Sequence, residues 1–174
     1  MELWDLYTAN RAPLGRTHRR GEPLPPGGFH LVVHVWLRDS GGRYLLSQRA
    51  ADRPTFPLMW ETTGGSVLAG EDSAAGALRE VREELGVRLD PEKGRVVFSQ
   101  VRDWVDGRRF GDILDVWQFE YSGEAHLEEA DGEVKQAQWL SLEEARVLYR
   151  SGQMVGTLGY FFIPGKQELF APGP

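Results

Sequence analysis

The alternation of hydrophobic and polar residues predicts β-strands early in the chain. Two β-rich runs, LVVHVWL at residues 31–37 and RYLLSQ at residues 43–48, flank the polar segment RDSGG and predict a hairpin. The Pro- and Gly-rich residues 21–28 before them predict a loop that closes an N-terminal extension. A second proline-containing loop, ADRPTFPLMW, leads into a short predicted strand, ETTGG.

Three more strands are predicted in the second half of the chain. Residues 94–105 (GRVVFSQVRDWV) and 112–121 (DILDVWQFEY) alternate well enough to form long antiparallel strands around a turn near residues 106–109. VKQAQWL, at residues 134–140, predicts a shorter strand. Strands and helices mix without a regular β–α–β repeat, which favours an α/β fold with a mixed sheet covered by helices over a doubly wound parallel sheet.

Two amphipathic segments predict helices. In the stretch GGSVLAGEDSAAGALREVREELGV, Asp72 or Ser73 can cap the start of a helix, and Gly86 stands where a left-handed residue ends one. SLEEARVLYRSG predicts a helix ending at Gly152, because Ser141 and Glu144 have the spacing of a capping box. The first helix would bury an apolar stripe made of Ala74, Ala77, Leu78, Val81 and Leu85.

Three carboxylates share one face of the first helix. At 100° per residue, Glu83 and Glu84 lie about 60° and 40° to either side of Glu80. Like charges at this spacing cost about 0.2–0.5 kcal/mol per pair. Either Arg79 and its neighbours offset the repulsion on an ordinary solvated face, or the carboxylates hold a hard divalent cation such as Mg²⁺. The helical spacing alone leaves both interpretations open.

Composition narrows the class of protein. The 174 residues suit one domain, and 41% hydrophobic with 26% charged residues is typical of a soluble globular protein. A net charge of −6 argues against nucleic acid as the main partner, and the basic run RTHRR (16–20) is either a solvated loop or a site that attracts anions. The absence of cysteine excludes disulfides and thiolate chemistry. No signal-like start or long apolar run is present, so we expect a cytoplasmic location and no membrane partner.

The spacing around the glutamates matches a known motif. Gly65 is followed after five residues by Glu71, and after seven more by REVREELGV, residues 79–87. This resembles the signature of the Nudix hydrolase superfamily, with every fixed position present. Seven such matches arise by chance at a frequency on the order of 10⁻⁸ per starting position, given about 7% usage per residue type.

The resemblance implies a fold and a set of roles. The implied fold is an α/β/α sandwich with a mixed β-sheet, formed by one domain over residues 1–174. Residues 1–28 would be an N-terminal strand and loop extension, and residues 165–174 a loosely structured tail. The resemblance assigns metal binding and catalysis to Glu80, Glu83 and Glu84. It implies that Arg79 takes part in catalysis by positioning Glu80. It also implies that three residues shape the motif: Gly65, Glu71 and Gly86.

Some site residues lie outside the motif. Glu133 resembles a further acidic ligand of the family's nucleoside-triphosphate pyrophosphatases, with Asp115 and Glu120 as competitors and an ordinary acidic loop as the alternative. Arg49 and Arg53, together with Gly65, are candidates for binding the substrate, since arginine can pair with phosphate bidentately; surface ion pairs are the alternative for both arginines.

Histidines and aromatic residues give weaker signals. His30 and His34 fall on the same strand face, where they either contact phosphate or metal or simply fill the sheet with satisfied hydrogen bonds. Several aromatic residues are candidates for ring stacking near a pocket, although aromatic residues are more often core: Trp4, Tyr7, Phe56, Trp60, Tyr160 and Phe161.

A second resemblance covers the N-terminal half. ELWDLYTANRAPLG, FHLVVHVWL and LLSQRA before FPLMWE look like the isopentenyl-diphosphate-isomerase-like branch of the superfamily. Isomerases of that type use a cysteine shortly after the tryptophan equivalent to Trp60, where this chain reads ETTGG. Isomerase chemistry is therefore disfavoured.

The resulting expectation is a metal-dependent hydrolase. It would use Mg²⁺, with Mn²⁺ also suitable, to cleave a diphosphate linkage in a nucleoside diphosphate joined to another moiety. The expected partner is a small-molecule phosphoanhydride, bound by a monomer or a homodimer. A non-catalytic, nucleotide-sensing module on the same scaffold is the alternative outside enzymes.

Overall fold

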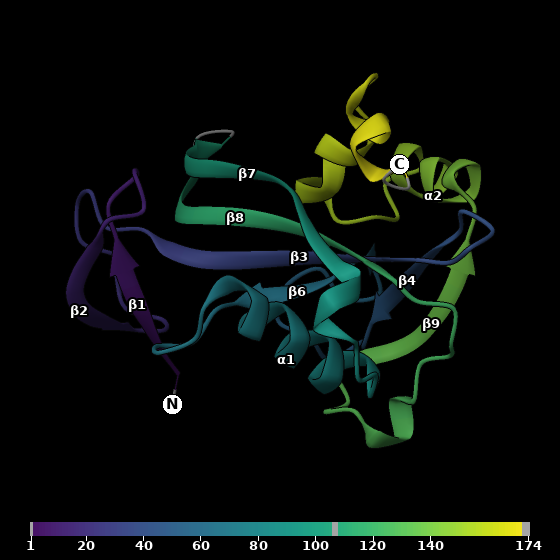
Figure 1. The fold of residues 1–174 in the computed structure, drawn as a ribbon, viewed down its shortest axis with the longest axis horizontal. Helices are drawn as coiled ribbons and strands as arrows, with labels where there is room; N and C mark the ends of the chain where they lie inside the picture. The colour runs from purple at the N-terminus through teal and green to yellow at the C-terminus, as the bar shows by residue number, and fades with distance from the viewer. Residues whose placement is uncertain (1, 106–107, 172–174) are drawn as a thin grey trace.

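The chain folds around one mixed β-sheet with helices on both faces (Figure 1). A computed structural model describes residues 2–105 and 108–171. The sheet order is β5–β4–β3–β8–β7, with β6 also paired to β3 and β9 to β4. The strands of this sheet are β3 (His30–Arg38), β4 (Tyr44–Arg49), β5 (Trp60–Glu61), β6 (Thr63–Ser66), β7 (Gly94–Val105), β8 (Arg108–Glu120) and β9 (Val134–Leu140).

Strand pairing confirms the mixed sheet. β3 runs parallel to β8, and the other pairs are antiparallel, including the predicted β3–β4 and β7–β8 hairpins. The turn expected near residues 106–109 falls partly on residues 106–107, which lie outside the described residues. The helical elements are α1 (Ser73–Leu85), α2 (Leu142–Arg150) and the 3₁₀ helices η1 (Pro91–Lys93), η2 (Leu127–Glu129), η3 (Gly156–Phe162) and η4 (Lys166–Phe170).

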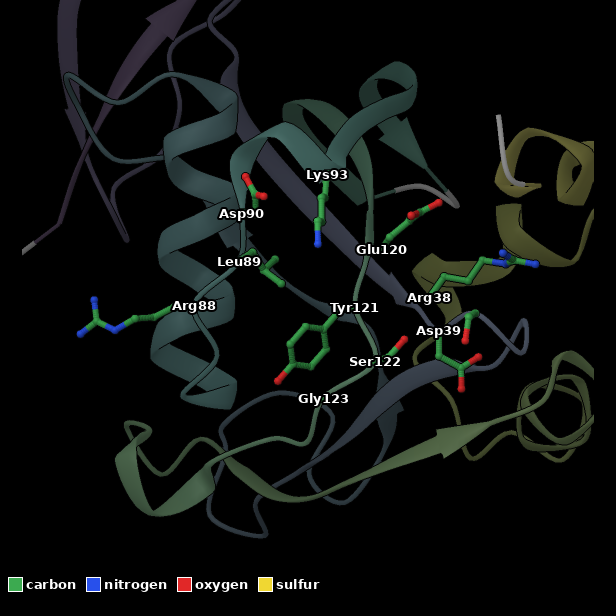
Figure 2. Close-up of a pocket in the computed structure, with 11 residues that line it drawn as sticks. Arg38, Asp39, Arg88, Leu89, Asp90, Lys93, Glu120, Tyr121, Ser122 and Gly123 are labelled. Atoms are coloured by element: carbon green, nitrogen blue, oxygen red, sulfur yellow. The ribbon is translucent and has the colours of Figure 1, made fainter. Parts of the chain in front are cut away.

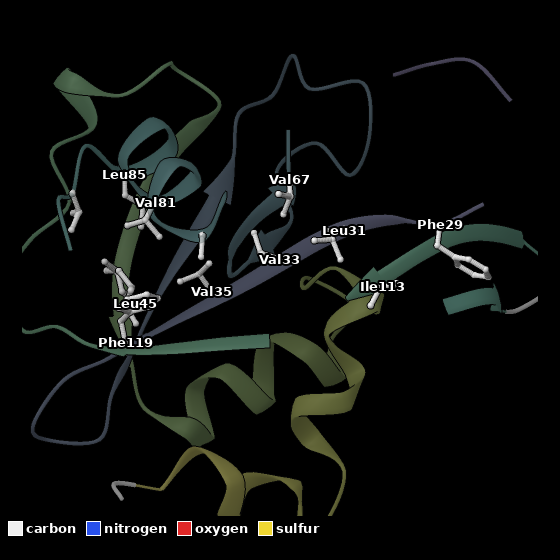
Figure 3. Packing of buried hydrophobic residues seen from close by; sticks show 13 residues of the cluster. Phe29, Leu31, Val33, Val35, Leu45, Val67, Val81, Leu85, Ile113 and Phe119 are labelled. Carbon is white, nitrogen blue, oxygen red and sulfur yellow. The ribbon is translucent and has the colours of Figure 1, made fainter. Parts of the chain in front are cut away.

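Strand β3 separates two hydrophobic cores. Its odd-numbered residues, such as Val33 and Val35, pack with the apolar stripe of α1, including Val81 (Figure 3). Its even-numbered Trp36 faces the opposite way and stacks on Phe161 of η3, with ring centroids 3.8 Å apart. Because side chains alternate across a strand, one central strand supports both helical layers. The predicted α/β/α sandwich is confirmed.

Both predicted helix starts are confirmed by their caps. Asp72 caps α1, its side chain accepting a hydrogen bond of 2.8 Å from the backbone of Ala75. Gly86 ends α1 in the left-handed region, at φ 67°. Ser141 and Glu144 form the expected capping box of α2, which ends at Arg150, two residues before the predicted Gly152.

The described residues near both ends of the chain contain more regular structure than predicted, and residues 172–174 of the predicted loose tail lie outside the described residues. The N-terminal extension contains two strands, β1 (Leu3–Tyr7) and β2 (Pro13–Arg19), which form a separate antiparallel hairpin (the N-terminal hairpin). The predicted loose tail instead contains η4, because Phe170 is fully buried against Trp36 and Phe161. The segment ETTGG divides between two strands, β5 and β6. No helix in the described ranges is long and apolar enough to cross a membrane.

His30 and His34 share a sheet face, as predicted, but they serve packing. The Nδ1 atom of His34 lies 2.9 Å from the hydroxyl of Tyr160, and the ring of His30 stacks on Trp4 at 3.9 Å. Burial, with a smaller effect of Arg102, lowers the pKa of His34 to about 3. Burial is also the main cause that lowers the pKa of His30 to about 4. The structure therefore supports the interpretation that both rings fill the sheet face, with a hydrogen bond for His34, whereas the buried Nδ1 of His30 has no hydrogen-bond partner among the described residues.

These buried histidines predict a loss of stability in mild acid. In the unfolded chain these histidines become protonated near pH 6.5, whereas in the folded chain they stay neutral down to about pH 4. Each histidine therefore lowers the free energy of unfolding by up to about 1.4 kcal/mol per pH unit as the pH falls from about 6.5 to 4. Chemical denaturation across this range should give a shallower pH dependence for His34→Gln than for the wild-type chain. His126→Gln, on an exposed side chain, is the control, and equal slopes for all three proteins would contradict the assignment.

Candidate active site

Two glycines of β6 bring the sheet and helix α1 into close approach. A Cβ atom on Gly64 would lie 2.3 Å from the carbonyl oxygen of Val33, and one on Gly65 would lie 2.4 Å from a carboxylate oxygen of Glu80. At Gly64 the neighbouring atoms are backbone, so that position needs glycine, whereas a side chain at Gly65 would displace the flexible end of Glu80. Gly65 is therefore the place where the Glu80 side chain lies against bare backbone.

Arg79 ties the motif together. Its Nε donates to both carboxylate oxygens of Glu71 at 2.9 and 3.1 Å, and Nη2 donates to the carbonyl of Ser66 at 2.9 Å. Its Nη1 donates to Glu80 at 3.0 Å and to Glu83 at 2.8 Å. One guanidinium thus joins the loop, the strand and two of the three glutamates. Glu71 is itself fixed to the loop, where it accepts a bond of 3.0 Å from the backbone of Leu68.

The three glutamates differ in exposure, which corrects the expectation of one exposed carboxylate face. The side chain of Glu83 is 49% exposed and that of Glu80 only 13%. Glu84 is buried, and its carboxylate faces the backbone N–H of Gly64 at 3.4 Å. The close approach of β6 covers two of the three carboxylates, and no pattern of residue types predicts how close that approach is.

Burial and mutual repulsion disfavour the charged forms of these carboxylates. Burial raises the pKa of Glu80 to about 7, with Glu83 and Glu2 adding to the shift and Arg79 opposing it. Burial also raises the pKa of Glu84 well above its usual value, helped by Glu61, Glu80 and Glu133. The site therefore concentrates negative charge in a poorly solvated place, which a cation would stabilise.

Glu61 of β5 belongs to this group and was missed in the sequence. It is mostly buried, forms an ion pair with Arg49, and burial raises its pKa, as does the nearby Glu133. A single glutamate after Trp60 gives no periodic or motif signal. Only the pairing of β5 with β4, which sets Glu61 opposite Ser47, brings it beside the motif.

The predicted site residues outside the motif are partly brought to it. Arg53 and Glu133 form an ion pair at 2.6 Å, and Arg49 pairs with Glu61 and donates to the carbonyl of Thr55 at 2.9 Å. Arg49, Arg53, Thr55 and Glu133 line a cavity of about 460 Å³, called here the motif cavity. Its lining residues are Glu2, Arg20, Arg49, Arg53, Thr55, Gly64, Gly65, Ser66, Leu68, Arg79, Glu80, Glu83, Glu84, Asp131 and Glu133.

Asp115 and Glu120 do not line the motif cavity. Asp115 is buried, paired with Arg11, and accepts a bond of 2.5 Å from Ser99. Glu120 lines a different cavity of about 560 Å³ beside Arg38 and Lys93 (Figure 2). Of the three candidates for a further acidic ligand, Glu133 is the one placed at the motif.

Other expectations change in the structure. The basic run 16–20 is not a loop, since most of it forms β2, where His18 is buried, and Arg20 after it lines the motif cavity. Trp60 and Phe161 are buried core residues, and Tyr160 accepts a bond of 3.0 Å from the indole of Trp36. Phe56, 41% exposed, and the other proposed stacking residues are absent from the described lining of the motif cavity.

The donor set suits a hard divalent cation. The acidic groups that line the motif cavity supply carboxylate oxygens, the ligands preferred by Mg²⁺ and Mn²⁺. Among the described residues, however, no three acidic or histidine side chains already converge on one point as a metal cage. Arg79 donates to one carboxylate oxygen of Glu80 and to one of Glu83, and the second oxygen of each carboxylate makes no hydrogen bond with this arginine.

Comparison with known proteins identifies the family. A family model described as the NUDIX domain matches residues 28–155. The chain belongs to the Nudix hydrolase family. It is 37% identical over 164 residues to an uncharacterized Nudix hydrolase of Listeria monocytogenes, covering 94% of this chain and 92% of that protein.

Other similarities agree with the fold and with the second resemblance. A crystal structure from Deinococcus radiodurans superposes with a TM-score of 0.75 at 22% identity, covering 98% of this chain and 100% of that one. An isopentenyl-diphosphate Delta-isomerase of Nocardia farcinica is 37% identical over 97 residues, covering 55% of this chain and 53% of that protein. Similarity to the isomerases is thus confined to part of each chain.

The contact between Gly65 and Glu80 predicts a sharp functional effect. In Gly65→Ala, the added methyl group must displace the Glu80 carboxylate, and an error of about 1 Å at a reacting centre costs roughly 10²-fold in rate. We expect that loss of turnover with little change in melting temperature, because a flexible carboxylate end moves instead of backbone. Gly156→Ala, which meets no atom within 4 Å, should leave both quantities unchanged. Full activity of Gly65→Ala would remove Glu80 from the site.

Proposed function

We propose that this protein hydrolyses a diphosphate linkage in a nucleoside diphosphate joined to another group, and that the reaction takes place in the motif cavity with Mg²⁺ or Mn²⁺ as the cation. The observation that carries this proposal is that Glu80 and Glu84 line the same cavity as Arg49 and Arg53. The acidic groups suit a metal ion, and the guanidinium groups suit phosphate oxygens.

The chemistry needs one water and breaks one P–O bond. A bound divalent cation would neutralise phosphate charge and make the attacking water more acidic. A carboxylate of α1 would accept a proton from the water while the oxygen of the water bonds to phosphorus. The bond from phosphorus to the bridging oxygen would break, and that oxygen would leave with the second phosphate. Arg49 and Arg53 would orient the phosphates, since Glu61 and Glu133 hold both side chains beside the cavity.

A substrate panel tests the proposal. The compounds are nucleoside di- and triphosphates, nucleotide sugars, dinucleotides, coenzyme A and isopentenyl diphosphate, each with Mg²⁺ or Mn²⁺ and with products identified by mass. ADP-ribose with Mn²⁺ is a reasonable first member, because a structural neighbour from Francisella tularensis is described as a bifunctional NMN adenylyltransferase/ADP ribose pyrophosphatase complexed with AMP and Mn. That neighbour has a TM-score of 0.62 at 21% identity and covers 85% of this chain and 43% of its own.

Glu84→Gln and Glu83→Gln should each lower turnover by roughly 10²-fold or more, the scale of a lost acid–base or metal group. Glu143→Gln is the matched control, since Glu143 is also a helical glutamate paired with an arginine one turn away, on α2. Because Glu84 is buried among other carboxylates, its neutral replacement should not lower the melting temperature of metal-free protein. Unchanged turnover in both site variants would refute the proposed site.

The panel also decides between the alternatives. Conversion of isopentenyl diphosphate to its isomer would establish the isomerase, which the chain's lack of cysteine disfavours. Tight binding of a nucleotide without turnover, in protein that also binds Mg²⁺, would favour a sensing module. Cleavage of one compound class that depends on Glu84 would establish the hydrolase and its bond.

A further inference from the structure

The N-terminal hairpin is fastened to the loop that carries the motif. The backbone N–H of Ala69 donates to the carbonyl of Leu3 at 2.8 Å, and the N–H of Gly70 donates to the Asp5 carboxylate at 2.8 Å. Both acceptors belong to β1, and both donors lie between β6 and α1. The hairpin therefore has a defined position relative to the glutamates of α1.

Further contacts hold the other side of the N-terminal hairpin. Tyr7 and Phe29 exchange two backbone hydrogen bonds of 2.8 and 2.9 Å, and the buried Asp115 of β8 pairs with Arg11. A buried carboxylate that loses its partner costs several kcal/mol, so the pair with Arg11 resists separation. These anchors make the hairpin a fixed wall of the site.

Two side chains at the open end of this hairpin reach the motif cavity. The backbone N–H of Arg20 donates to the carbonyl of Glu2 at 3.1 Å, which places the two residues opposite each other. Their side chains form an ion pair at 2.7 Å, with Arg20 58% and Glu2 43% exposed. Both residues line the motif cavity, and Glu2 is close enough to Glu80 to contribute to its raised pKa.

The other arginines of the cavity are more tightly held. Arg79 has four acceptor groups, and the side chains of Arg49 and Arg53 are only 13% and 24% exposed in their ion pairs. An exposed ion pair contributes about 0–1 kcal/mol, and separating an ion pair costs more as its two side chains become less exposed to water. Among the arginines of the described lining, Arg20 is therefore the one whose ion pair an incoming anion can replace at the lowest cost in free energy.

We propose that Arg20 breaks its ion pair with Glu2 and binds the diphosphate of the substrate instead. Its planar guanidinium can hold two phosphate oxygens at once. Glu2 pairs with Arg20 before the substrate arrives, and this pairing keeps the guanidinium at the cavity. The identity of the ligand rests on the proposed function, while the exchange of partners rests on the Glu2–Arg20 geometry.

Calorimetry with imidodiphosphate and Mg²⁺ tests this proposal, because the bridging nitrogen resists hydrolysis. Arg20→Ala should raise the Kd about tenfold, the scale of one charge-assisted hydrogen bond. Arg19→Ala is the matched control: the side chain is 52% exposed, pairs with Glu22 at 3.6 Å and is not among the described residues that line the motif cavity. Arg20→Lys should recover part of the affinity. An equal effect of Arg19→Ala and Arg20→Ala would reduce the observation to general charge and overturn the proposal.

A double-mutant cycle tests the exchange of partners. Glu2→Gln should lower the Kd in the wild-type background, since it frees Arg20, and should have a smaller effect in the Arg20→Ala background. Equal effects in both backgrounds would mean that Glu2 acts only by repelling the anion, and the exchange would be wrong. All of these side chains are exposed, so melting temperatures should stay close to wild type.

Failure of this proposal is distinguishable from failure of the proposed function. If a diphosphate linkage is cleaved in a Glu84-dependent reaction while Arg20→Ala changes neither KM nor the Kd, the role of Arg20 is refuted and the proposed hydrolase activity is supported. If imidodiphosphate binding depends on Arg20 but no compound is cleaved, Arg20 is supported as an anion-binding residue and the proposed hydrolysis is refuted.

Discussion

The guanidinium of Arg79 is the interaction on which the arrangement of the site depends. It contacts Glu71 of the loop, the carbonyl of Ser66 in β6, and both Glu80 and Glu83 of α1. Lysine has no planar fork and cannot replace these simultaneous contacts. Because the loop also carries the anchors of the N-terminal hairpin, the same arginine indirectly sets the wall that bears Arg20.

The site combines groups that oppose folding with groups that compensate for them. Glu61, Glu80 and Glu84 are buried near one another, an arrangement that disfavours their charged forms. Arginines offset part of this cost, and the two hydrophobic cores on either face of β3 supply the rest of the stability. Such a concentration of poorly solvated charge is typical of catalytic sites, where stability is traded for reactivity.

The sequence predicted regular features well and approach distances poorly. Helix α1, its caps and the hairpin of β3 with β4 follow from local patterns, and helical periodicity alone placed Glu80, Glu83 and Glu84 on one helix face. The burial of Glu84 depends on how closely glycines let β6 approach α1, a tertiary property. Strand pairing brings Glu61 beside the motif carboxylates, and the docked hairpin brings Arg20 to the cavity, and no sequence periodicity predicts either placement. For the same reason, the burial of Phe170 was not foreseen.

The position of Glu2 has a practical consequence for work with this protein. Since Glu2 lines the motif cavity, a polypeptide fused to the amino terminus would be attached close to this cavity. An amino-terminal affinity tag would compete with substrates for that space, and a histidine-rich tag would bring metal ligands beside the carboxylates. The opposite end of the described chain is held at the start of β7, where the carbonyls of Leu169 and Ala171 accept bonds from Arg95. Carboxyl-terminal fusions are therefore the safer design for kinetic and metal-binding measurements.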